Sequence, residues 1–104
     1  MAINSKAKGK NGEAEIARIL RGYGYDARRG VQYHGGPDSP DVVGLDGLHL
    51  EIKRVERLNI SEAMKQSIKD AGELMPVVMH RKNREGWLVT LRLDDFMKLY
   101  GGKL

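Results

Sequence analysis

Apolar residues recur along the chain at two spacings, one typical of helices and one typical of strands. Stripes at helical spacing predict helices over 9–23, 61–71 and 93–100. Glycines close the first two of these segments, and Ser61 is suited to cap the start of the second. These three segments account for the predicted helices.

Alternating and β-branched segments between the helices predict strands. They cover 25–32, 41–45, 48–55, 75–80 and 86–92. A loop rich in glycine and proline, at 34–40, separates the first two, and Asp46-Gly47 predicts a tight hairpin between the next two. The order α-β-β-β-α-β-β-α predicts one small α/β domain, with helices flanking a central mixed sheet.

The strand at 48–55 separates apolar from polar side chains. Leu48, Leu50 and Ile52 face one side, whereas His49, Glu51 and Lys53 face the other. A carboxylate and an ammonium group therefore point the same way from mid-strand. One interpretation is the solvated outer face of an amphipathic strand, and the other is a reactive site.

The hairpin register decides whether a second acid joins Glu51. A two-residue loop at Asp46-Gly47 turns the carboxylate of Asp41 to the opposite face. A three-residue loop at 45–47, with its glycine left-handed, pairs Asp41 with Glu51, and we favour this register because such glycine-bulge loops are common. Two carboxylates placed so suit a hard cation such as Mg²⁺. The alternative is an aspartate that only caps the loop after Pro40.

Glu13 interrupts the apolar stripe of the first predicted helix. It lies between the directions of Ile16, Ala17 and Leu20 on that helix. An acid on a face that packs against the core needs a partner or a metal ion. The alternative is an acid in the first turn that interacts favourably with the helix dipole.

Charge and composition limit the classes of protein to which this chain can belong. The 104 residues carry 18 Lys+Arg and 14 Asp+Glu, and the absence of cysteine excludes disulfides, thiolate-bound zinc, iron–sulfur clusters and a cysteine nucleophile. Residues 1–30 hold seven basic and three acidic groups, whereas residues 31–60 hold three and five. Acids in the middle segment suit a metal-dependent enzyme acting on phosphates better than a simple nucleic-acid binder. With no apolar run long enough to span a bilayer and no signal-peptide pattern, we expect a soluble intracellular protein.

Two motifs resemble those of a known nuclease family. The segment Pro40-Asp41, nine residues and Glu51-Ile52-Lys53 resembles the PD-(D/E)XK nuclease signature. The opening KGKNGEAE, at 8–15, is similar to that of the Holliday-junction-resolvase-like branch in its archaeal and phage forms. Phage-type members resemble the chain over nearly its whole length, including VERLNISEAMKQ and WLVTLRLDDF.

The resemblance implies a restriction-endonuclease-like fold and a metal site. Asp41, Glu51 and the Ile52 carbonyl would ligate Mg²⁺ or Mn²⁺, and Glu13 would complete the site. Lys53 would orient or help to deprotonate the attacking water and stabilise charge near the scissile phosphate.

Other residues are candidates for contact with DNA. Ser39 matches a serine that often precedes the metal-binding aspartate in the resolvases. Gln66 lies on the helix after Glu-X-Lys, where related nucleases often place a helper Gln or Lys. A plain solvent-facing glutamine fits Gln66 equally well. The basic candidates are Lys6, Lys8, Lys10, Arg28 and Arg29. Their alternative role is ordinary surface solubility, and residues 1–8 are expected to form a mobile basic arm.

The remaining ring side chains are interpreted without a cofactor. His34, His49 and His80 lack zinc spacing and are expected to face solvent or DNA. His49 shares the face of Glu51, which would place it near the site. Trp87 and Phe96 are expected in the core.

We therefore expect a single nuclease domain over 1–104. The family implies a Mg²⁺-dependent endodeoxyribonuclease of DNA recombination, which resolves Holliday junctions or other branched DNA and leaves 5′-phosphates. It also implies a bacterial cytoplasmic setting with a phage or prophage origin. A C2 homodimer follows because symmetric cutting needs two sites. The alternatives are a nicking or flap-processing nuclease with the same site, and a non-catalytic DNA-binding module.

Overall fold

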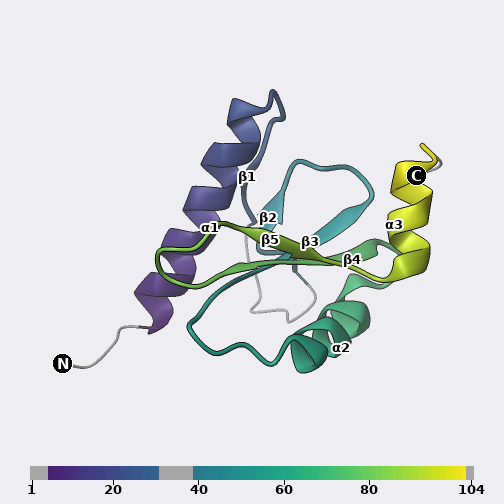
Figure 1. Cartoon of the computed structure of the whole chain (residues 1–104). Coiled ribbons are helices and arrows are strands. Elements are labelled where there is room, and N and C mark those ends of the chain that lie inside the picture. Colours follow the sequence, from purple (N-terminus) through teal and green to yellow (C-terminus); the bar gives the residue numbers. More distant parts are fainter. Residues whose placement is uncertain (1–4, 31–38, 103–104) are drawn as a thin grey trace.

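The computed structural model describes residues 5–30 and 39–102, with side chains from residue 8 onward. Helices flank a mixed sheet in these ranges (Figure 1). The elements are α1 (Ser5–Gly22), β1 (Arg28–Arg29), β2 (Val42–Val43), β3 (Leu48–Arg54), α2 (Ile60–Ala71), β4 (Met75–Arg81), β5 (Leu88–Thr90) and α3 (Leu93–Tyr100). Their order is the one predicted, and the α/β class is confirmed.

Within the described residues the sheet has five strands in the order β1-β2-β3-β4-β5. Only the β3–β4 pair is parallel among these described strands, because α2 forms a crossover between them; the other neighbours are antiparallel. α1 packs on β1, β2 and β3, and α2 packs on β3 and β4. Figure 1 shows α1 and α2 on opposite sides of the sheet, with α3 at the far end.

The main hydrophobic core lies between α1 and the sheet. Ile16 and Ala17 of α1 pack in one cluster with Leu50 and Ile52 of β3. The opposite face of β3 is also covered, since His49 is only 1% exposed. The interpretation of that face as solvated is therefore wrong, and so is the expectation that His49 faces solvent or DNA.

Several element boundaries differ from those predicted. α1 begins at Ser5, four residues before the predicted start, and the predicted strand at 25–32 is paired only over Arg28–Arg29 in the described part. The loop at 34–40 lies mostly outside the described residues, as does His34. Phe96 is 48% exposed rather than buried in the core, because α3 covers only the end of the sheet.

The N-cap of α2 is Asn59, not Ser61. The Asn59 Oδ1 atom accepts a hydrogen bond from the Glu62 backbone N–H at 3.1 Å. Asparagine caps a helix as well as serine does, so the helix begins one residue before Ser61 and gains Ile60.

Gly44 lies where the loop after β2 passes close to the backbone of Ala27. Its φ is +125°, and an added Cβ would lie 2.6 Å from the Ala27 Cα. Gly44→Ala should therefore lower the free energy of unfolding by about 2 kcal/mol or more. Gly9→Ala, in open space on α1, should raise it by up to about 1 kcal/mol. Urea denaturation of both variants tests the pair, and equal stabilities would contradict the close packing.

Candidate functional site

The β2–β3 hairpin brings Asp41 across from Glu51. Val42 pairs with Leu50, and the same antiparallel register, extended by one residue, places Asp41 opposite Glu51. In the loop between these strands Gly47 is left-handed, with φ of 85°. This is the three-residue-loop register that we favoured. The Ile52 backbone N–H donates to Asp41 Oδ2 at 2.8 Å, so this carboxylate is held against β3 and does more than cap the loop after Pro40.

Glu51 lies in an environment that disfavours its charge. Its side chain is 12% exposed. Burial, followed by the negative charge of Asp41, raises the pKa of Glu51 to about 8, while the positive charge of Lys53 acts in the opposite direction. The two carboxyl groups also share a hydrogen bond that favours a proton on Glu51. At neutral pH the pair therefore holds a proton.

Glu13 approaches the same pair from α1. Burial, followed by the charge of Asp41, raises the pKa of Glu13, while Arg29 and Lys10 lower it. Arg29 Nε donates to Glu13 Oε1 at 3.2 Å. The structure thus places the third predicted acid within electrostatic reach of Asp41, with a charged partner of its own.

The donor set suits a hard cation more than a soft one. Carboxylate oxygens and a backbone carbonyl are the ligands that Mg²⁺ and Mn²⁺ prefer. Within residues 5–30 and 39–102, no three His, Asp or Glu side chains converge closely enough to form a ready metal cluster. Asp41 and Glu51 are in contact, and Glu13 is coupled to Asp41 by charge.

Most of the predicted DNA contacts already have partners. Arg29 binds Glu13, Arg28 lies 3.4 Å from Asp26, and Lys8 Nζ lies 3.6 Å from Glu56 Oε2. Lys10 is exposed on α1, while the side chain of Lys6 lies outside the described residues. Three of the five basic candidates therefore have acidic partners in this structure.

Gln66 lies on α2, and Ser39 lies just before β2. Gln66 is exposed on α2 and donates from Nε2 to both carboxylate oxygens of Asp70 at 3.0 Å. Ser39 is half-buried, two residues before Asp41.

Glu51 has two further neighbours, of which the sequence predicts only one. The charge of Asp70 contributes to the raised pKa of Glu51, and His49 Nδ1 lies 3.9 Å from Glu51 Oε1. The alternation of the strand places His49 on the face of Glu51, and its expected proximity to the site is confirmed. Asp70 had no such signal, because only the packing of α2 on the sheet brings it near.

A partly buried ion pair fixes the helix that carries Glu13. Arg81 of β4 donates to Glu15 through Nε at 2.8 Å and through Nη2 at 3.2 Å, and the Trp87 indole N–H donates to the same carboxylate. These contacts lower the pKa of Glu15, with the Arg81 hydrogen bond as the largest cause. Glu15 thus ties α1 to the β4–β5 hairpin. No local motif marks this contact, since the partners are 66 and 72 residues apart.

No helix in the described residues is long and apolar enough to span a membrane.

Comparison with known proteins identifies the fold. No family model matches the chain, and no curated protein matches it in sequence. The chain is similar to the 1.6 Å structure of Hjc, a Holliday junction resolvase from the archaeal hyperthermophile Archaeoglobus fulgidus. The TM-score is 0.59 at 23% identity, over 81% of this chain and 72% of that chain. The chain therefore has the fold of a resolvase-like nuclease.

The raised pKa of Glu51 predicts a pH-dependent cost to stability without metal. Between about pH 4.5 and 8 the folded state keeps a proton on Glu51 that the unfolded state has lost. The contribution of Glu51 to the free energy of unfolding therefore falls as the pH rises through that window. With EDTA at pH 9, Glu51→Gln should therefore unfold with a free energy about 2 kcal/mol higher than the parent, and the difference should shrink toward pH 5. Urea denaturation at both pH values measures it.

The control is Glu62→Gln, an exposed acid on α2, which should show no such pH-dependent difference. A gap between parent and Glu51→Gln that is the same at both pH values would contradict the assignment of the proton to Glu51.

Proposed function

We propose that the chain is a metal-dependent DNA endonuclease of the PD-(D/E)XK type that cleaves Holliday junctions or other branched DNA. The observation that carries the proposal is the Asp41–Glu51 carboxyl pair beside Lys53. The fold shared with a Holliday junction resolvase supports the substrate class. From the sequence resemblance to phage-type members of the resolvase-like branch, we further propose a phage or prophage origin and action in the bacterial cytoplasm.

The carboxyl pair is the proposed place for the metal ion. Asp41, Glu51 and the Ile52 carbonyl would hold Mg²⁺ or Mn²⁺, and Glu13 would complete the set from α1. When bound, the ion would polarise the phosphoryl oxygen and make water a nucleophile at neutral pH. The raised pKa of Glu51 supports this site, because the two acids cannot both be charged cheaply without a counter-ion.

The residues around the proposed ion have separate roles. The Ile52 N–H orients the carboxylate of Asp41, and Arg29 holds that of Glu13. Lys53 shares the face of Glu51 and brings a compact positive charge. It would orient the attacking water and stabilise charge on the scissile phosphate, and the leaving strand would depart with a 3′-hydroxyl, leaving a 5′-phosphate.

The surface around the pair would bind the DNA backbone. We propose phosphate contacts from Lys6, Lys8, Lys10, Arg28 and Arg29, with Ser39 near the scissile phosphate and Gln66 as a helper. The positive charge of the chain, +4 in total, supports a polyanionic partner.

A homodimer would supply the two sites that symmetric cutting needs. An apolar groove of about 450 Å³ lies where α3 meets the sheet, and we name it the α3 groove; its residues include Leu48, Val77, Val89, Phe96 and Tyr100. Val89 and Tyr100 are 56% and 79% exposed, and β5 is an edge strand of the described sheet. A two-fold axis at this edge would pair identical surfaces. Leu48 and Val77 lie on the face of the sheet opposite Glu51, so a second copy here leaves the site open.

Cleavage of labelled DNA tests the proposed activity. With Mg²⁺ we expect paired symmetric nicks on a four-way junction, weaker cutting of a linear duplex and of a flap, and none with EDTA. Asp41→Asn and Glu51→Gln should each lower the cleavage rate by about 100-fold or more while junction binding persists. Glu73→Gln, an exposed acid, is the matched control and should cut normally.

The outcomes separate the rival functions. Equal cutting of all three DNAs would favour a nicking or flap nuclease and remove the junction preference. Tight binding without cleavage by the parent protein would favour a non-catalytic DNA-binding module.

The dimer is tested by sedimentation velocity at micromolar concentration. We expect the parent to sediment as a dimer, and Tyr100→Glu to sediment as a monomer with an unchanged circular dichroism spectrum, because a charge in the α3 groove opposes apolar burial. Ile68→Glu, on exposed α2 surface, should stay dimeric. A parent that stays monomeric when bound to DNA would rule out the homodimer.

A further inference from the structure

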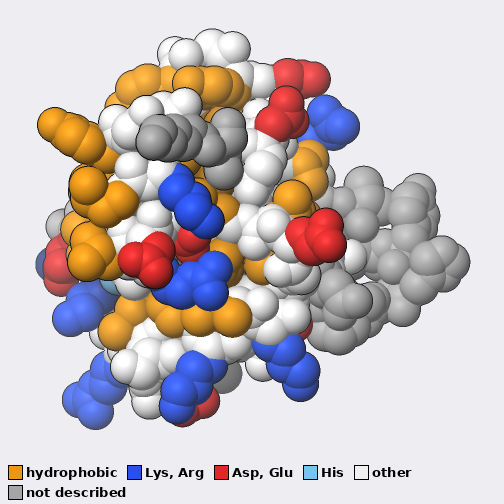
Figure 2. Space-filling model, turned by 90° about the vertical axis from the view of Figure 1, so that its right-hand side faces the viewer, with side chains coloured by type: hydrophobic (Ala, Val, Ile, Leu, Met, Phe, Trp, Pro, Cys, Tyr) orange, Lys and Arg blue, Asp and Glu red, His pale blue; other side chains and the backbone are white. Residues whose placement is uncertain are grey.

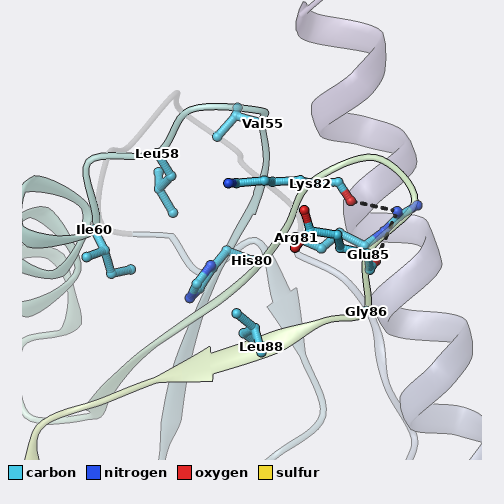
Figure 3. Close-up of a pocket in the computed structure, with 9 residues that line it drawn as sticks. All are labelled: Val55, Leu58, Ile60, His80, Arg81, Lys82, Glu85, Gly86 and Leu88. Carbon is cyan, nitrogen blue, oxygen red and sulfur yellow. Dashed lines mark hydrogen bonds between the residues drawn. The ribbon is translucent and has the colours of Figure 1, made fainter.

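A concave site opens on the face of the sheet that carries Glu51, between the end of β3, the start of α2 and the β4–β5 hairpin. This cavity of about 280 Å³ is named the hairpin pocket here (Figure 3). Its lining includes Val55, Leu58, Ile60, His80, Lys82 and Leu88. The proposed cleavage chemistry uses none of these residues.

The strand register places the hairpin pocket next to Lys53. His80 of β4 is the parallel partner of Lys53, and Leu88 of β5 is the antiparallel partner of His80. Paired residues in a sheet direct their side chains to the same face, and neighbouring strands lie about 4.8 Å apart. The hairpin pocket therefore begins one strand away from Lys53, on the face that carries Glu51.

The lining combines apolar walls with a few polar groups. Val55, Leu58 and Leu88 surround the opening in Figure 3, and the ammonium end of Lys82 reaches over it toward Leu58. The His80 ring is held by a hydrogen bond between Nε2 and Thr90 Oγ1 at 2.8 Å. Burial lowers the pKa of His80, which favours the neutral ring.

Such a lining suits a flat heteroaromatic ring attached to a phosphate. Small-molecule sites are concave, largely apolar and fitted with a few fixed polar groups, and bases bind proteins through their faces as well as their edges. Lys82 at the mouth supplies a positive charge for the phosphate of the same nucleotide. Glu85, which also lines the hairpin pocket, adds one carboxylate that could accept from an exocyclic amino group.

We propose that the hairpin pocket receives one unstacked nucleobase, from the nucleotide adjacent to the scissile phosphate. The proposal rests on the proposed endonuclease activity, because it takes the scissile phosphate to lie at Lys53. A base in continuous duplex is paired and stacked, whereas a base at a branch point leaves the stack at lower cost. The pocket would thereby select branched DNA over linear duplex.

The test compares the parent with Leu88→Trp, which fills the hairpin pocket from a side chain that is 60% exposed. Cleavage first maps the scissile phosphate on a four-way junction. A junction with 2-aminopurine at the flanking nucleotide is then bound in EDTA, where unstacking raises its fluorescence. We expect a several-fold rise with the parent and none with Leu88→Trp. The preference for junction over duplex in cleavage should fall about tenfold, while the duplex rate stays unchanged.

Two controls make the result specific. Leu74→Trp changes an exposed leucine that does not line the hairpin pocket and should behave as the parent does. Leu58→Trp fills the hairpin pocket from another wall, so it replaces Leu88→Trp if that variant unfolds. On a junction that is abasic at the flanking nucleotide, parent and Leu88→Trp should cleave at equal rates, because no base remains to be bound.

The possible failures are distinguishable. The parent, Leu88→Trp and Leu58→Trp could all show metal-dependent junction cleavage with the same fluorescence and the same preference for junction over duplex. That result would rule out base binding in the hairpin pocket and leave the proposed nuclease activity unaffected. Absence of metal-dependent cleavage by the parent would overturn both.

Discussion

Two carboxyl groups held in contact across the β2–β3 hairpin impose the constraint on which the rest of this structure depends. Like charges this close in a half-buried place repel each other, and the protein offsets part of the repulsion in three ways. The Ile52 N–H binds Asp41, Lys53 supplies a positive charge, and Glu51 keeps a proton at neutral pH. Because a bound cation would relieve this repulsion between carboxylates, such a site favours cation binding.

α1 is anchored so that Glu13 remains within reach of this pair. The Glu15–Arg81 ion pair and the Trp87 indole hold one side of the helix to the β4–β5 hairpin, while Arg29 holds Glu13 on another. Partly buried, bidentate arginine–carboxylate contacts fix orientation better than exposed pairs do. Charge is thus used to position a helix as well as to line the site. Figure 2, which looks at the molecule from the α3 side of Figure 1, shows hydrophobic side chains gathered toward the upper left of this face and most Lys and Arg side chains in its lower half.

The two faces of the central strands have separate uses. One face forms the core under α1 and continues into the α3 groove, and the other carries the carboxyl pair and the hairpin pocket. The parallel β3–β4 register brings Lys53 beside His80 and so makes the site and the hairpin pocket neighbours. That register follows from the crossover through α2, which forces β4 to run alongside β3 in the same direction.

The sequence by itself determined the element order, the alternation along β3 and the hairpin that pairs Asp41 with Glu51. These depend on local physics: residue spacing, and a glycine free to take a left-handed conformation at Gly47. Only the tertiary structure decided that α2 buries His49, that Asp70 approaches Glu51, and that Arg29 binds Glu13. These contacts join different elements; Arg29 and Glu13, for example, are 16 positions apart in the sequence. No local pattern encodes which side chains meet when the helices pack on the sheet.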